Sequence, residues 1–148
     1  MRIRLLTFGA VGLLVAAGAV AGEKGTTAEA KALLDKAVAE VQKDGSATAI
    51  AKFNDPAGGF RDRDLYVFCM DASHRIMAHP DASLRGTDAA ALKDANGKAF
   101  GAEMVAVAKK GGGSVEYMWK NPVSGKVEDK VSYLKKAGDL SCGVGAYK

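Results

Sequence analysis

The chain has 148 residues, with a hydrophobic fraction of 48% and a charged fraction of 26%, which are ordinary values for one globular domain with its own core. The net charge is +4, and taking away Arg2 and Arg4 near the start leaves +2 from Gly22 onward. The lysines are interleaved with acids and form no basic stripe with aromatic platforms, so the composition speaks against nucleic-acid binding.

The first 21 residues have the pattern of a secretory signal peptide. Arg2 and Arg4 give a positive start, residues 5–21 are an uncharged run rich in Leu, Val, Ala and Gly, and Ala19-Val20-Ala21 offers the small residues that a signal peptidase reads. The run is shorter than the ~20 residues of a membrane span, which favours cleavage over an uncleaved anchor. We therefore predict a signal peptide over 1–21 and a single periplasmic or secreted domain over 22–148.

The domain is predicted to begin with two helices. Thr26 followed by Glu29 fits a capping box, and apolar residues then recur at helical spacing until Gly45. These apolar residues are Ala30, Leu33, Leu34, Ala37, Val38 and Val41. Ser46 is expected to cap a second, short helix that ends at Pro56.

The rest of the chain reads as strands with helices inserted between them. Residues 65–70 and 75–78 are predicted strands joined by a turn at 71–74. A loop with a short helix over 84–96 and a longer helix over 98–110 follow. Strands are then expected over 114–119, 126–134 and 140–147, the first two joined by the turn at 121–125. This order predicts an α+β domain around a five-stranded antiparallel sheet.

Cys69 and Cys142 are the two cysteines of the chain, and both lie in predicted strands. In an oxidising compartment they are candidates for a disulfide between an early strand and the last one. The alternative is a pair of buried free thiols, since sequence gives no Cα separation.

The sequence holds no complete catalytic or metal-binding motif. His74 lies in a turn and is expected at the surface, and its spacing from His79, with only scattered carboxylates nearby, is weak for a metal site. There is no nucleophile elbow, no phosphate-binding glycine motif and no C-x-x-C pair. We expect neither an enzyme nor a metal or cofactor site.

Five segments taken together resemble the single Cache domain family, of type 2. They are DLYVFCMD, MAHP, GTDAAALKDANGKAF, VEYMWKNPVSGKVEDKVSYL and GVGAYK, and the resemblance runs from about Leu33 to Lys148. It implies a PAS-like five-stranded antiparallel sheet, a long N-terminal helix and short helices on one face, with a small-molecule pocket between sheet and helices. Members usually form the periplasmic sensing part of chemoreceptors, histidine kinases and cyclase regulators, whereas no output domain follows in this chain.

The resemblance supports His79, Tyr117, Trp119, Lys130 and Tyr133 as ligand-binding candidates. Tyr117 and Trp119 share one face of a strand and offer aromatic walls with a hydroxyl and an indole N–H. Lys130 supplies a positive charge and His79 a further donor, which suits the carboxylate of a small organic acid. The alternative is that the aromatic residues only fill the core, Lys130 is exposed and His79 holds a turn.

We therefore predict an exported sensory module for signal transduction or chemotaxis. It is expected to bind a small organic acid or similar molecule, as a monomer or weak homodimer, and to act with a separate membrane receptor or transporter. One alternative is a protein–protein interaction module with a vestigial pocket. Another is a membrane-anchored sensor fragment that retains its leader.

Overall fold

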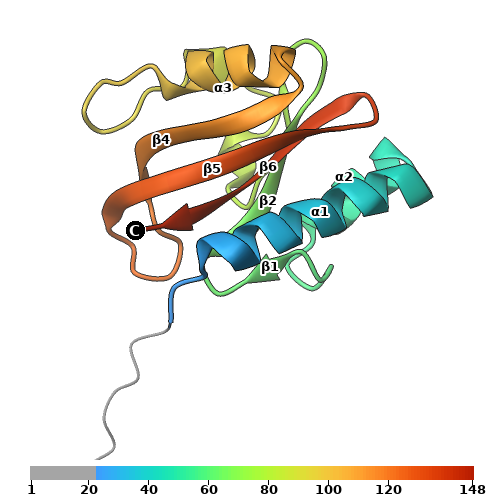
Figure 1. The fold of residues 1–148 in the computed structure, drawn as a ribbon, viewed down its shortest axis with the longest axis horizontal. Coiled ribbons are helices and arrows are strands. Elements are labelled where there is room, and N and C mark those ends of the chain that lie inside the picture. The colour runs from blue at the N-terminus through green and yellow to red at the C-terminus, as the bar shows by residue number, and fades with distance from the viewer. Residues whose placement is uncertain (1–22) are drawn as a thin grey trace, which may run out of the picture.

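The computed structural model describes residues 23–148, so the predicted signal peptide lies outside the described residues. An antiparallel sheet forms the middle layer, with helices packed on both of its faces (Figure 1). The helices are α1 (Thr27–Asp44), α2 (Ser46–Asn54) and α3 (Phe100–Lys109), with 3-10 turns η1 (Ala82–Leu84) and η2 (Ala89–Ala91). The strands are β1 (Arg61–Asp62), β2 (Leu65–Met70), β3 (Ile76–Ala78), β4 (Gly112–Lys120), β5 (Val127–Ala137) and β6 (Leu140–Tyr147).

The strand order is β1-β2-β6-β5-β4, and β3 pairs with β2. The last strand therefore inserts between β2 and β5, so that it lies beside a strand far earlier in the sequence. The predicted α+β antiparallel architecture is confirmed. Six strands are present where five were expected, because the two-residue β1 adds a short pairing at the edge of β2.

Helix α1 covers one face of the sheet. Its predicted capping box is present, because the Thr26 hydroxyl accepts from the Glu29 amide and the Glu29 carboxylate accepts from the Thr26 amide. The helix ends at Gly45, whose φ of 82° suits a residue without a side chain. Its buried stripe is Ala30, Leu34, Ala37 and Val41, which joins Val144 and Ala146 of β6 in one apolar cluster.

The start of α2 differs from the expectation. Gly45 holds the N-cap position without a side-chain bond, and Ser46 is already helical. The hydroxyl of Ser46 instead donates to Asp139 in the β5–β6 turn. The prediction that Ser46 caps this helix is therefore wrong.

The second face of the sheet is covered by α3 and by the segment that precedes it. The short helix expected over 84–96 is replaced by two 3-10 turns, each started by an aspartate (Asp81, Asp88) whose carboxylate accepts a backbone N–H two residues on. The short helices are thus divided between the two faces, with α2 beside α1 and α3 opposite. None of the helices within residues 23–148 has the length and apolar character needed to cross a bilayer.

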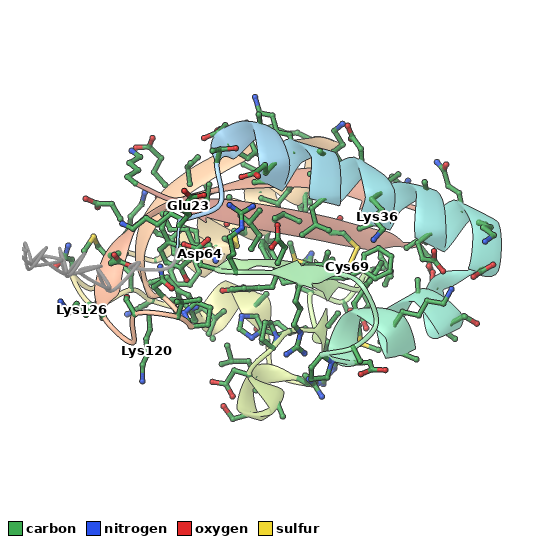
Figure 2. All side chains as sticks on the ribbon, turned by 90° about the horizontal axis from the view of Figure 1, so that it is seen from below. Glu23, Lys36, Asp64, Cys69, Lys120 and Lys126 are labelled. Atoms are coloured by element: carbon green, nitrogen blue, oxygen red, sulfur yellow. A yellow bond between two sulfur atoms is a disulfide. The ribbon has the colours of Figure 1, made fainter. Side chains whose placement is uncertain are left out.

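Cys69 and Cys142 form a disulfide, in agreement with the predicted pairing. They are directly opposite each other in the β2–β6 register, with Cα atoms 4.0 Å apart, and both are buried on the α1 face. The bond therefore fastens the two strands at the centre of the sheet (Figure 2).

Candidate ligand-binding site

The face of the sheet away from α1 carries the candidate site. Because side chains alternate along a strand, each strand presents every second residue to this face. These residues are Tyr66, Phe68 and Met70 of β2, Val115, Tyr117 and Trp119 of β4, and Lys130, Ser132 and Leu134 of β5. Helix α3 closes the face from above with Phe100 and Met104.

A small apolar cavity lies between this face and α3. It has a volume of about 30 Å³, little more than one water molecule needs, and its lining is almost entirely apolar. The lining residues are Tyr66, Phe68, Cys69, Met70, Ile76, His79, Ala89, Leu92, Phe100, Met104, Tyr117 and Trp119. A separate surface depression of about 290 Å³ adjoins it, bounded by Tyr66, His79, Pro80, Asp81, Trp119, Lys120 and Pro122.

Three aromatic rings belong to both hollows and form the partition between them. His79 lies edge-on to Tyr66 at 5.2 Å and to Trp119 at 6.5 Å between ring centroids. These three residues, which we call the aromatic partition, are the point at which the surface meets the interior. A ligand entering from the depression would meet this partition first.

Lys130 lies behind the aromatic partition and is only 1% exposed. Its ammonium donates to the hydroxyl of Tyr66 at 2.8 Å and to that of Tyr147 at 3.5 Å, and it sits 4.0 Å from the ring centroid of Tyr66. Within residues 23–148 it forms no ion pair with a carboxylate. Burial lowers the pKa of Lys130 to about 7, and the negative charge of Asp64 partly opposes that shift.

The side chain of Lys130 reaches β2 from β5 by crossing β6 at Gly145. A Cβ atom on Gly145 would lie 2.2 Å from Lys130 Cε and 2.4 Å from Ser132 Oγ. Any side chain there would therefore push the lysine out of its path. Gly143, on the same face of β6, leaves room in the same way for the ring of Phe68.

His79 is neutral and half-buried. Its Nδ1 accepts a hydrogen bond from the Asp81 amide at 2.9 Å, so the ring proton is on Nε2. Burial first, and then the positive charge of Lys130, lower the pKa of His79 to about 4. The side chain can thus donate one hydrogen bond from Nε2 without carrying a charge.

Tyr117 faces the cavity with its ring, while its hydroxyl is already used. The ring stacks on Phe100 at 4.2 Å between centroids with an interplanar angle of 5°. The hydroxyl bonds to Ser132 Oγ at 2.9 Å. Tyr117 therefore contributes a wall and no free polar group.

The structure brings His79, Tyr117 and Trp119 together at the cavity and places Lys130 just behind them. It does not bring Tyr133 there. Tyr133 points to the α1 side of the sheet, where Lys31 lies 4.7 Å from its ring centroid. Tyr133 is three positions from Lys130 in one strand, and residues an odd number of positions apart point to opposite faces.

Sequence reasoning missed Tyr66 and Tyr147, the two partners of Lys130. Tyr66 alternates with Phe68 on β2, so its face was open to prediction from period two alone. The position of β6 between β2 and β5 was not open to prediction in this way, and it is this order that brings the two tyrosines to one lysine.

A wider groove of about 580 Å³ lies at the other end of the sheet. Lys109, Lys110 and Lys136 line it, all of them exposed, and no buried polar group points into it. Because specific sites combine enclosure with a few convergent polar groups, the smaller cavity is the better candidate.

Comparison with known sequences agrees with this description. The sequence profile of the family described as single Cache domain 2 matches residues 9–147. Sensor histidine kinase MctS of Rhizobium johnstonii is 37% identical over 73 residues, which make up 49% of this chain and 16% of that kinase. The chain thus spans a small part of the length of this curated relative.

Solved structures show the same fold. A methyl-accepting chemotaxis protein from Vibrio parahaemolyticus aligns with a TM-score of 0.69 and 24% identity, over 81% of this chain and 86% of that one. A periplasmic sensor domain of a chemotaxis protein aligns with a TM-score of 0.60 and 24% identity, over 79% and 86% of the two chains. A Cache chemosensory domain, solved to explain its recognition of a carboxylic acid, gives 0.58 and 25% identity over 79% and 84%.

Proposed function

The chain belongs to the single Cache domain 2 family, and we propose that it binds a small carboxylate-bearing ligand at the aromatic partition. Cache domains are sensory, ligand-binding modules rather than enzymes, and this fold is shared with sensor domains of chemotaxis proteins. The family thus supplies the general role, and the chemistry of the site is the basis for the ligand class.

The observation that carries the proposal is the buried ammonium of Lys130. An ammonium has three N–H donors, and only the hydroxyls of Tyr66 and Tyr147 accept from it among residues 23–148. A buried charge without a carboxylate in contact with it is costly, and an anion brought close to it would relieve that cost. A carboxylate is the small organic anion that fits a lysine and neutral donors.

Neutral donors of the partition are arranged to bind such an anion. Tyr66 accepts from Lys130 through its hydroxyl oxygen and still carries one hydroxyl proton, for which an anion would compete with the neighbouring Tyr147 hydroxyl. His79 offers Nε2–H, and Trp119 offers its indole N–H. Burial raises the pKa of Tyr66 well above its ordinary value, so it stays a proton donor at neutral pH.

The partner and the location belong to the same proposal. We infer that the leader directs export of the domain and that the domain works outside the cytoplasm. Its ligand-bound form would then act on a membrane receptor, kinase or transporter. The resemblance to a chemosensory domain that recognises a carboxylic acid supports the ligand class, and the part-length match to a sensor histidine kinase supports a signalling partner.

The small volume of the inner cavity favours a second candidate function. At about 30 Å³ it holds no organic acid in this conformation, so a ligand must occupy the outer depression or displace the partition. If neither happens, the pocket is vestigial and the domain is a protein–protein interaction module.

Thermal unfolding of the purified protein with small carboxylates tests the proposal. A ligand present at a hundredfold excess over its Kd should add about 2.7 kcal/mol to the free energy of unfolding. The matched control is the amide of each acid, which has the same shape without the charge. If no acid raises the unfolding temperature, or if acid and amide raise it equally, the carboxylate proposal is wrong.

Substitutions in and away from the proposed site test where the ligand binds. For an acid that binds, Lys130→Met and Tyr66→Phe should raise the Kd about tenfold or more, because each removes a charge-assisted bond. Tyr133→Phe and Lys136→Met are the matched controls, since both lie away from the cavity, and they should leave the Kd unchanged. Native mass spectrometry of freshly purified protein would identify a ligand that co-purifies.

A further inference from the structure

The turn between β4 and β5 exposes apolar side chains in a way that the ligand site does not explain. Val123 is 57% exposed and Val127 is 49% exposed, and they are the exposed large hydrophobic residues of the described chain, 23–148. Pro122 is exposed beside them. Single exposed apolar residues are common, but these lie within one short turn.

The same turn is basic. Residues 119–127, WKNPVSGKV, contain Lys120 and Lys126 and no acid. Neither lysine forms an ion pair with any residue in the part of the chain that the structure describes. The neighbouring Lys24 and Lys148 do form ion pairs, with Glu128 and Glu116 respectively. Lys120 and Lys126 are therefore lysines of this end that have no ion pair within residues 23–148, and Glu23 is an exposed carboxylate at the same end (Figure 2).

The turn is held in shape from within. The buried side chain of Asn121 accepts from the Val123 amide at 2.8 Å and donates to Asp64 at 3.1 Å. The Gly125 amide donates to the Asn121 carbonyl at 2.8 Å. Val123 thus stays exposed because the backbone is fixed, which lowers the entropic cost of docking on a surface.

The turn lies at the end of the molecule where the described chain begins. Figure 2 labels Glu23, Lys120 and Lys126 at one end, far from Lys36 and Cys69. The residues before Glu23 include the uncharged run 5–21. If the leader is held in a bilayer, either before its cleavage or because it is not cleaved, this end of the domain would lie toward the lipid.

From these observations we propose that the β4–β5 turn is a docking surface for an anionic lipid bilayer. Val123 and Val127 enter the headgroup boundary, and Lys120 and Lys126 contact lipid phosphates. Apolar side chains flanked by lysines are the combination that binds reversibly to such surfaces. Two lysines and two valines alone bind a bilayer weakly. Such weak binding suits a surface that orients the domain on the membrane while a separate contact keeps the domain there. The turn borders the outer depression of the ligand site at Lys120 and Pro122, whereas Val123, Lys126 and Val127 take no part in it. Vesicle binding and carboxylate binding are measured separately, so either proposal can fail without the other.

Trp119 makes the proposal measurable, because it is the single tryptophan of the chain and precedes Lys120. The purified protein, with whichever N-terminus its mass indicates, would be mixed with phosphatidylcholine vesicles with or without roughly one third phosphatidylglycerol. Lipids brominated near the headgroup should quench Trp119 in the anionic vesicles and not in the neutral ones. Since quenching reports depth, it remains informative even if a retained leader anchors every variant.

Two variants and a matched control complete the test. Lys120→Gln with Lys126→Gln should lower the partition of the turn about twenty-five-fold, at about fivefold per lysine, and Val123→Ser with Val127→Ser should abolish the quenching. Lys109→Gln with Lys110→Gln removes the same charge from exposed positions before β4, at its other end, and should change nothing. Absent quenching in anionic vesicles, or equal losses in the control, would overturn the proposal.

Discussion

Lys130 is the residue at which the interior of this domain departs most from an ordinary apolar core. Its ammonium is buried between the hydroxyls of Tyr66 and Tyr147, across the gap that Gly145 leaves in β6. A hydrophobic residue of similar length would fill the same space without the cost of burying a charge. The retention of a lysine there is consistent with a binding function rather than with stability.

The pKa of Lys130 makes its effect on stability measurable. Because the folded pKa is about 7, below the ordinary value of 10.5, the unfolded chain binds more protons between these values. The free energy of unfolding should therefore rise with pH from about 7 upward, by at most about 1.4 kcal/mol per pH unit. Urea unfolding of wild type and Lys130→Met at several pH values between pH 7 and about 9.5 tests this, and the variant should lack the slope.

Other titratable groups limit the pH range over which Lys130 determines the slope, and a second lysine variant supplies the control. His79, with a folded pKa of about 4, gives its own rise only at lower pH, and the raised pKa values of Tyr66 and Tyr147 act above pH 10. Lys136→Met makes the same substitution at an exposed position of β5 and should keep the wild-type slope. A slope that survives in Lys130→Met would contradict the burial of a titrating lysine.

At this scale the sequence predicts residue types better than their arrangement. Trp119 and His79 were expected at a pocket and lie at one. Lys130 was expected either to touch a ligand or to be exposed, and because it is buried behind Tyr66 the exposed alternative is wrong. The difference arises because a side chain that crosses a neighbouring strand depends on strand order and on a glycine in the strand between, and neither is a local property of the sequence.

At the scale of elements, Asp64 joins three parts of the fold. It is 2% exposed, and its carboxylate accepts from the Gly25 amide at 2.7 Å and from the Asn121 side chain at 3.1 Å. The start of α1, the start of β2 and the β4–β5 turn are thus held together by one buried carboxylate.

Asp64→Ala should loosen this junction. The Gly25 amide and the Asn121 side chain would each lose an acceptor in a buried place, at about 1–3 kcal/mol for each group left unpaired. We expect a lower free energy of unfolding and faster amide exchange over 25–30. Asp62→Ala is the matched control, because Asp62 is exposed and its ion pair with Arg63 is a surface contact worth little. Equal effects of the two substitutions would show that Asp64 has no special role.

Most elements were predictable because their signals are local. The capping box at Thr26, the β-rich run of β2 and the turn after β4 all appear where the sequence indicates them. The segment 84–96 was predicted less well. Its two 3-10 turns depend on aspartate caps and on contact with α3, which a helical pattern does not reveal.

On the scale of the whole molecule, the sheet separates two different interiors. The face toward α1 and α2 is a continuous apolar cluster, and the face toward α3 holds the cavity and the buried lysine. The disulfide lies on the apolar side, at the centre of the strand pair that brings the early and late parts of the chain together. This division lets one face supply stability while the other keeps the polar groups that the proposed ligand requires.

The disulfide should therefore support the fold without contributing to ligand affinity. Cys69 and Cys142 are 73 residues apart, and closing a loop of that length restricts the unfolded chain by about 4 kcal/mol. We expect Cys69→Ala with Cys142→Ala to lower the free energy of unfolding by about that amount in urea, and dithiothreitol to destabilise wild type but not the variant. Cys69 also borders the inner cavity, but both cysteines belong to the apolar cluster beneath α1, so the variant should bind any carboxylate ligand with unchanged Kd while it remains folded. A large loss of affinity in a folded variant would mean that the two faces of the sheet are coupled.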